Sequence, residues 1–90
     1  MSVGAELHTL QELHKTFDNN SQAALDIKKA VNDSVGASVW TGTYADEFRN
    51  AWDDYQKNLD VLSDALAKAR DDVRTNHNNI AAATGEPDRL

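Results

Sequence analysis

Apolar residues recur along the chain at intervals of three, four and seven, and two long segments share this pattern. Such spacing places side chains along one stripe of an α-helix, whereas a strand would alternate every second residue. The stripe of the first segment, about residues 4–36, contains Leu7, Leu10, Phe17, Ile27 and Val31. Polar residues interrupt the same register at His14, Ser21 and Lys28, so this stripe is imperfect.

The second segment, about residues 43–84, has a more regular stripe. Its members are Phe48, Trp52, Tyr55, Leu59, Leu62, Leu66 and Val73. Thr43 is predicted to cap the start of this helix, with Asp46 three positions on completing a short capping box. Gly85 followed by Pro87 predicts its end.

The connection between the segments, about residues 37–43, is too short to let the helices run in the same direction. We therefore expect an all-α fold, an antiparallel helix-turn-helix hairpin over residues 1–90 with a short flexible tail at 85–90. One hairpin cannot cover all of its own apolar side chains. A second hairpin is expected to complete a four-helix bundle, so the two stripes are the predicted hairpin and dimer core.

Composition points in the same direction, because 90 residues without a cysteine lie near the lower size limit for a self-sufficient core. Disulfides and thiolate zinc sites are excluded, which leaves a partner as the route to stability. The net charge of −6 disfavours nucleic acid and strong binding to anionic membranes. Met1 is not followed by a basic and then an apolar stretch, so the sequence predicts no cleaved leader.

Candidate chemistry is sparse. His8 and His14 are six residues apart, which does not place them on one helical face for a shared metal ion. Adjacent acidic residues diverge by about 100° on a helix, so they do not converge for acid–base catalysis. His77 is expected near the end of the second helix, where a protonated imidazole favours the helix dipole. The sequence predicts no enzyme, no cofactor and no metal site.

The turn contains Val39-Trp40-Thr41-Gly42. A tryptophan in a turn carries a large apolar surface that is costly to leave in water. Gly42 supplies the backbone freedom that a chain reversal needs just before a helix begins. The plain structural interpretation is that Trp40 plugs the end of the bundle. Recognition by another protein is compatible with this, because one side of the ring can be buried while another edge stays exposed.

A helical chain of this length, with Trp-x-Gly at its midpoint and no predicted leader, resembles the ESAT-6-like WXG family. The resemblance covers the whole chain in length and architecture, and its fixed motif is Trp40 with Gly42. It implies a non-catalytic protein that a type VII secretion system exports as a folded dimer from the bacterial cytoplasm. The secretion ATPase and either a second copy or a paralogue are the partners that it implies.

In that family the export signal joins the Trp-x-Gly turn of one subunit to a tail motif on the other, a tyrosine followed four residues later by an acid. No tyrosine follows Tyr55 here, and residues 78–90 contain nothing that fits this motif. We therefore expect a heterodimer whose paralogous partner supplies the tail, with a homodimer left open. A cytosolic coiled-coil adaptor is the alternative, and a membrane-active helix pair is disfavoured by acidic charge on both helices.

Overall fold

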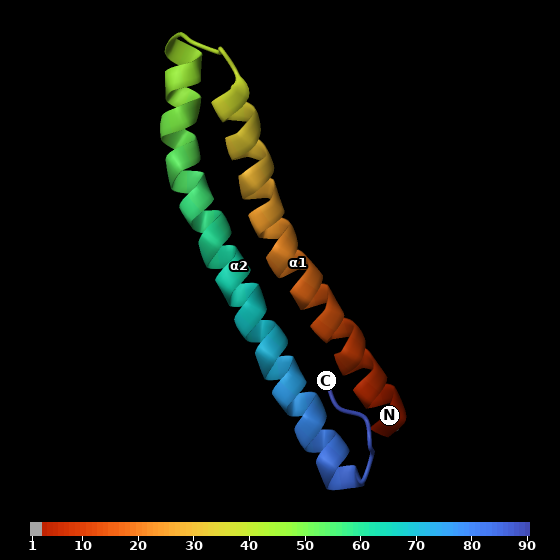
Figure 1. The fold of residues 1–90 in the computed structure, drawn as a ribbon. Coiled ribbons are helices and arrows are strands. Elements are labelled where there is room, and N and C mark those ends of the chain that lie inside the picture. Colours follow the sequence, from red (N-terminus) through yellow and green to blue (C-terminus); the bar gives the residue numbers. More distant parts are fainter. Residues whose placement is uncertain (1–2) are drawn as a thin grey trace.

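The computed structural model describes residues 3–90 and shows two long antiparallel helices (Figure 1). Helix α1 spans Val3–Ala37 and helix α2 spans Thr43–Thr84, so five residues connect them. The hairpin is rod-shaped, with extents of 63 × 18 × 18 Å. The expected all-α helical hairpin is confirmed. The four-helix bundle stays a prediction, because the structure contains one chain.

Both ends of α2 are defined by glycines with positive φ. The N-cap of α2 is Gly42, at φ 109° and ψ −179°, and no side chain caps this end. The predicted Thr43 cap is therefore wrong, because Thr43 is already the first helical residue. At the other end Gly85 is left-handed, at φ 75°, and the backbone N–H of Glu86 donates to the carbonyl of Ala81 at 2.9 Å. This Schellman-type closure reverses the chain, as the sequence indicated.

The two helices meet along a polar seam, not along the predicted apolar stripes. The residues that bond across this seam follow a seven-residue repeat, whose positions are lettered a to g with Leu7 and Ser63 both at position a. All of the side chains that bond across the seam lie at positions a and e, except Trp52, which lies at position d. From the open end towards the turn the contacts are Gln11–His77, Asp18–Arg70, Ser21–Ser63, Lys28–Asp60 and Asn32 with both Gln56 and Trp52. The interruptions at Ser21 and Lys28 thus mark the true helix–helix interface.

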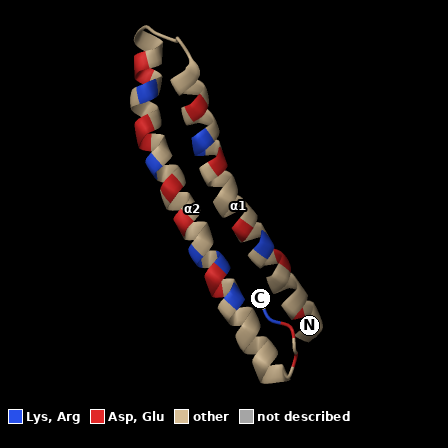
Figure 2. Cartoon of the chain, viewed as in Figure 1, with Lys and Arg blue, Asp and Glu red and all other residues tan. Residues whose placement is uncertain are grey.

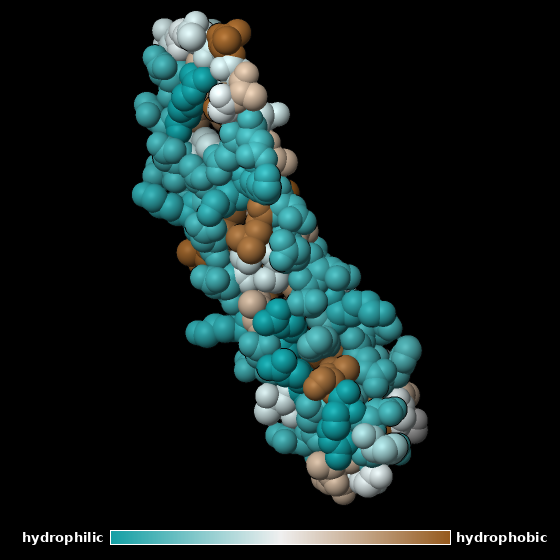
Figure 3. Space-filling view, in the orientation of Figure 1, coloured by the Kyte–Doolittle hydropathy of each residue, from teal (hydrophilic) through white to brown (hydrophobic). Residues whose placement is uncertain are grey.

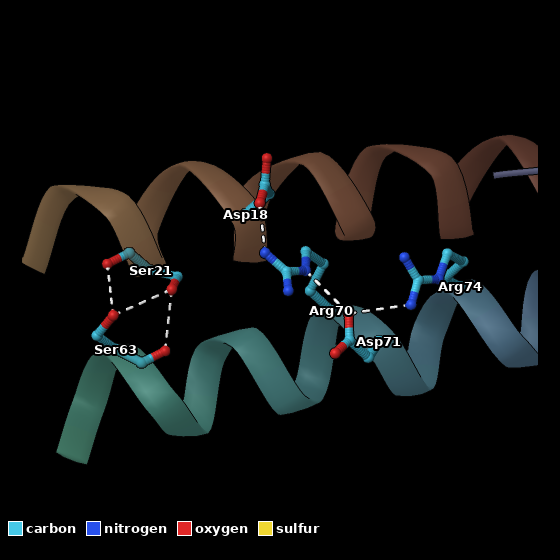
Figure 4. A network of polar contacts seen from close by, with 6 residues as sticks. All are labelled: Asp18, Ser21, Ser63, Arg70, Asp71 and Arg74. Atoms are coloured by element: carbon cyan, nitrogen blue, oxygen red, sulfur yellow. Dashed lines mark hydrogen bonds and ion pairs between the residues drawn. The ribbon is translucent and has the colours of Figure 1, made fainter. Parts of the chain in front are cut away.

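Ser21 and Ser63 bond the two helices directly to each other (Figure 4). Each hydroxyl donates to the other residue's backbone carbonyl, at 2.9 and 3.0 Å, and the two hydroxyl oxygens lie 3.2 Å apart. Both residues are buried. A side chain longer than serine would force the backbones apart, so this pair fixes the register and the spacing of the hairpin.

Little apolar surface is buried within the hairpin itself. Among the described residues, the buried apolar side chains are Leu7 and three alanines, Ala24, Ala45 and Ala81. Alanine contributes little to hydrophobic stabilisation because the stabilisation is proportional to the apolar area removed from water. The single hairpin therefore lacks the core that a chain of this length needs.

The larger apolar side chains lie at positions d and g instead. On each helix, positions d and g form a stripe beside the a/e seam. Because the helices are antiparallel, the stripes of both helices lie on the same side of the hairpin. We call this side the apolar face; it consists of Leu10, Leu13, Phe17, Ile27, Val31, Phe48, Trp52, Tyr55, Leu59, Leu62, Leu66, Val73 and Ile80. None of these residues is buried in the single chain.

The predicted core residues therefore differ in how far the single hairpin buries them. Only Leu7 is buried, whereas Ile27, Tyr55 and Leu62 are exposed by 53%, 60% and 47%. The half-buried members are Leu10, Phe17, Val31, Phe48, Trp52, Leu59, Leu66 and Val73. Burial of these side chains by a partner stays a prediction.

Charged groups alternate along both helices but are missing from the last turns of α2, residues 75–84 (Figure 2). Figure 3 shows a broad surface that is mainly hydrophilic, with separate apolar groups. The hairpin thus has a charged side and an apolar face. This sidedness is what an element of a larger bundle requires.

Candidate recognition surface at the helical turn

Trp40 packs against the side of α2 instead of projecting freely from the turn. Its ring centroid lies 5.7 Å from that of Phe48 at an interplanar angle of 46°, and 44% of Trp40 remains exposed. Phe48 in turn stacks on Trp52, with centroids 6.1 Å apart and planes 8° from parallel. Three rings thus extend the apolar face to the very end of the hairpin.

Arg49 fixes Trp40 from a second direction. Its Nη2 donates to the backbone carbonyl of Trp40 at 2.9 Å, and its guanidinium carbon lies 5.9 Å from the centroid of the Trp40 ring. A cation at this distance is attracted by the negative face of the aromatic ring. No sequence pattern points to Arg49, because it lies nine positions from Trp40 and the two residues meet only through the geometry of the turn.

Gly42 has a backbone conformation that is essentially restricted to glycine, with φ 109° and ψ −179°. A Cβ atom added there would meet nothing within 4 Å. The requirement for glycine is thus conformational and not steric crowding by neighbours. The carbonyl of Gly42 accepts from the N–H of Asp46 at 3.0 Å and so begins the hydrogen-bond ladder of α2.

The rest of the turn presents apolar groups to solvent. Val39 is 95% exposed and Tyr44 is 80% exposed. Trp52 is held more firmly, because its Nε1 donates to Oδ1 of Asn32 across the seam at 2.8 Å. The turn therefore has a rigid aromatic base and an exposed apolar rim, which is the composition that protein interfaces favour.

His77 lies near the end of α2, as expected from the sequence, and is fully buried in the seam between the helices. Its Nε2 is 3.1 Å from Nε2 of Gln11, and its Nδ1 is 3.1 Å from Oδ1 of Asn78. The same Asn78 side chain bonds both backbone groups of Leu90, at 2.8 and 3.2 Å. His77 therefore joins α1, α2 and the tail at the open end of the hairpin.

Ion pairs on the surface of the helices shift the pKa values of the groups that form them. Hydrogen bonds to Asp18 and Asp71 raise the pKa of Arg70, and the bond from Arg70 lowers the pKa of Asp71 (Figure 4). A hydrogen bond to Asp33 raises the pKa of Lys29. These pairs lie along the helices and away from the turn.

The described hairpin has no pocket, and residues 3–90 hold no group of three or more potential metal ligands. Neither described helix has an apolar stretch long enough to cross a membrane. Fold and surface define a helical hairpin with one apolar face and an aromatic turn. Comparison with protein-family models, curated proteins and solved structures finds no match.

Proposed function

We propose that this chain is a WXG-type substrate of a type VII secretion system, exported as a folded dimer with a paralogous hairpin. The observation that supports this most is the apolar face, which runs the length of the hairpin and ends on Trp40. A partner hairpin laid on this face supplies the core that the single chain lacks. Trp40 and Gly42 then lie at one end of the bundle, where the secretion ATPase can bind them.

The turn suits recognition because its shape is fixed before a partner arrives. Phe48 and Arg49 hold Trp40 on two sides, and Gly42 sets the direction in which the chain enters α2. A preorganised site loses less conformational entropy on binding than a mobile one. The proposed role is a signal patch and involves no catalysis.

The proposal is tested by measuring how much of each variant of this chain is exported by a bacterial strain that carries the secretion system. Trp40→Phe keeps an aromatic ring on Phe48 but removes the indole, so dimerisation is expected to persist while export falls to background. The matched control is Thr41→Ala, because Thr41 lies between Trp40 and Gly42 with its side chain exposed. Normal export of Trp40→Phe would refute the signal role.

A cytosolic coiled-coil adaptor is the second candidate, because the apolar face can also receive a single partner helix. It predicts that Trp40→Phe leaves partner binding and activity unchanged. Light scattering gives the mass of the chain alone and of the chain mixed with the paralogue encoded beside it. These masses distinguish a homodimer from a heterodimer. A stable, export-competent homodimer that binds no paralogue would overturn the heterodimer.

A further inference from the structure

Residues 86–90, which we call the strap, fold back along the hairpin after α2 ends (Figure 1). Two hydrogen bonds hold the far end of the strap. The N–H of Leu90 donates to Oδ1 of Asn78 at 2.8 Å, and Nδ2 of Asn78 donates to the carbonyl of Leu90 at 3.2 Å. Leu90 is 37% exposed, so most of its surface is covered. The strap is therefore docked on the hairpin and does not extend freely into solvent.

Bonds at the base of the strap and within it limit its conformations. The N–H of Glu86 donates to the carbonyl of Ala81 in the last turns of α2. Nη1 of Arg89 donates to the backbone carbonyls of Glu86 and Asp88, and the ring of Pro87 fixes one φ angle. A segment with few conformations loses little entropy when it docks, so two bonds at its far end can hold it in place.

The bonds around His77 fit one arrangement of protons. Oδ1 of Asn78 accepts from the N–H of Leu90, so Asn78 also presents an acceptor to Nδ1 of His77, which therefore carries the ring proton. In a neutral imidazole Nε2 is then an acceptor, and it lies 3.1 Å from the Nε2 donor of Gln11. One chain of hydrogen bonds thus runs from the strap through Asn78 and His77 to α1.

The seam is closed more completely beside the strap than at Ser21 and Ser63. These two serines remain 8% and 5% exposed, whereas the larger side chain of His77 is fully buried. Leu90 is bonded to Asn78, the residue that follows His77, so the far end of the strap lies beside this part of the seam. A buried polar group that loses its hydrogen-bond partner is costly. The imidazole therefore favours the state in which the strap is docked.

We infer that the strap is a latch that closes the open end of the hairpin, with Asn78 as the residue that holds it. Docking of the strap orients Asn78, which fixes the proton of His77 on Nδ1 and leaves Nε2 to accept from Gln11. Hydrogen bonds linked in this way strengthen one another. The strap and the seam at Gln11 therefore open and close together, and release of the strap exposes His77.

The latch lies on the side of the hairpin away from the apolar face. Asn78 precedes Ile80, a member of the apolar face, by two positions, which is about 200° around α2. A partner that covers the apolar face thus leaves Asn78 and the strap uncovered. The inference is independent of the proposed function, because neither export nor dimerisation enters its test.

The first test is the rate at which the N–H of Leu90 exchanges with water, measured by NMR on the full chain. Asn78→Ala removes both bonds to the strap and is expected to speed this exchange about fivefold or more. The matched control is Asn79→Ala, because Asn79 is the same residue type one position further on and is exposed. Equal exchange rates in Asn78→Ala and Asn79→Ala would overturn the latch.

The second test asks whether the strap and the seam are coupled. Gln11→Ala changes α1, does not remove a bond to the strap, and is nevertheless expected to speed exchange of the Leu90 N–H about twofold or more, because it leaves Nε2 of His77 unpaired. Gln22→Ala is the control on α1, because Gln22 bonds only along its own helix, to Asp26. If Gln11→Ala exchanges no faster than Gln22→Ala, the strap is not coupled to the seam and the inference is wrong.

The third test needs no substitution, so it remains decisive if a variant does not fold. Nitrogen-15 NMR of the imidazole at pH 8 shows which ring nitrogen carries the proton. The latch predicts Nδ1 for His77 in the unmodified protein, and Asn78→Ala is expected to remove this preference while far-UV circular dichroism shows that the helices persist. A proton on Nε2 in the unmodified protein would contradict the chain of bonds on which the latch depends.

Discussion

Replacing Gly42 with alanine changes only the backbone preference of the turn, because an added Cβ would meet no atom within 4 Å. The native conformation, φ 109° and ψ −179°, is one that residues with a Cβ scarcely populate. Holding a non-glycine residue there costs about 1–3 kcal/mol. We therefore expect Gly42→Ala to lower the free energy of unfolding by that amount, or to shift the turn and with it Trp40.

Gly36 provides a matched control in the same part of the hairpin. It lies within α1, and an added Cβ would again meet nothing within 4 Å. Glycine inside a helix is less stable than alanine by about 0.5–1 kcal/mol, so Gly36→Ala is expected to stabilise the protein. The same Gly→Ala substitution at two positions six residues apart should thus change the free energy of unfolding in opposite directions. The two variants should differ in this free energy by about 1.5–4 kcal/mol.

Urea denaturation followed by far-UV circular dichroism measures both variants at one fixed protein concentration, because association adds to the apparent stability. Tryptophan fluorescence, measured with Trp52 replaced by Phe in both variants so that Trp40 is the only indole, reports whether Trp40 keeps its place against Phe48. If Gly42→Ala proves as stable as Gly36→Ala with unchanged fluorescence, the turn does not require glycine and the reasoning is wrong.

Three other perturbations test different parts of the molecule. His77→Ala is expected to cost about 1–3 kcal/mol in urea denaturation, because it leaves the amide of Gln11 unpaired in the seam; an unchanged midpoint would contradict this. Leu62→Asp is expected to weaken dimerisation about 30-fold or more in sedimentation equilibrium, whereas Val61→Asp, one position away and off the apolar face, should have little effect. Equal effects would mean that the apolar face is not the dimer interface. The pKa of Asp71 is lowered in the fold, so its stabilisation is present above its unfolded pKa of about 3.9 and is lost as pH falls through the folded value. Asp71→Asn should therefore be less stable than the unmodified protein at pH 6, and this difference should shrink at pH 3; a constant difference would refute the linkage.

The sequence alone determined the helices and the turn between them. Apolar spacing and the glycines predicted helices over about 4–36 and 43–84, close to the observed Val3–Ala37 and Thr43–Thr84. Helices are predictable in this way because their hydrogen bonds and their periodicity are local. The cap of α2 was missed because Thr43 and Gly42 both suit an N-cap, and the turn geometry decides between them.

The tertiary structure decided which stripe of each helix faces the other. Hydrophobicity favoured the apolar stripes, but the helices pair through Ser21, Ser63 and the polar residues around them. A periodic pattern shows that a stripe is suited to burial and does not show whether it meets its own hairpin or another chain. That choice depends on contacts between residues 42 positions apart.

The same limit applies to the turn. Trp40 and Gly42 were found from their types and their position, because a tryptophan and a glycine in a short connection are conspicuous. Arg49 and His77 came only from the three-dimensional arrangement, since a lone arginine or histidine on a helix has no sequence pattern that reveals its neighbours. The sequence thus determined the elements and the motif, whereas tertiary contacts determined the seam, the free apolar face and the cation that stands beside Trp40.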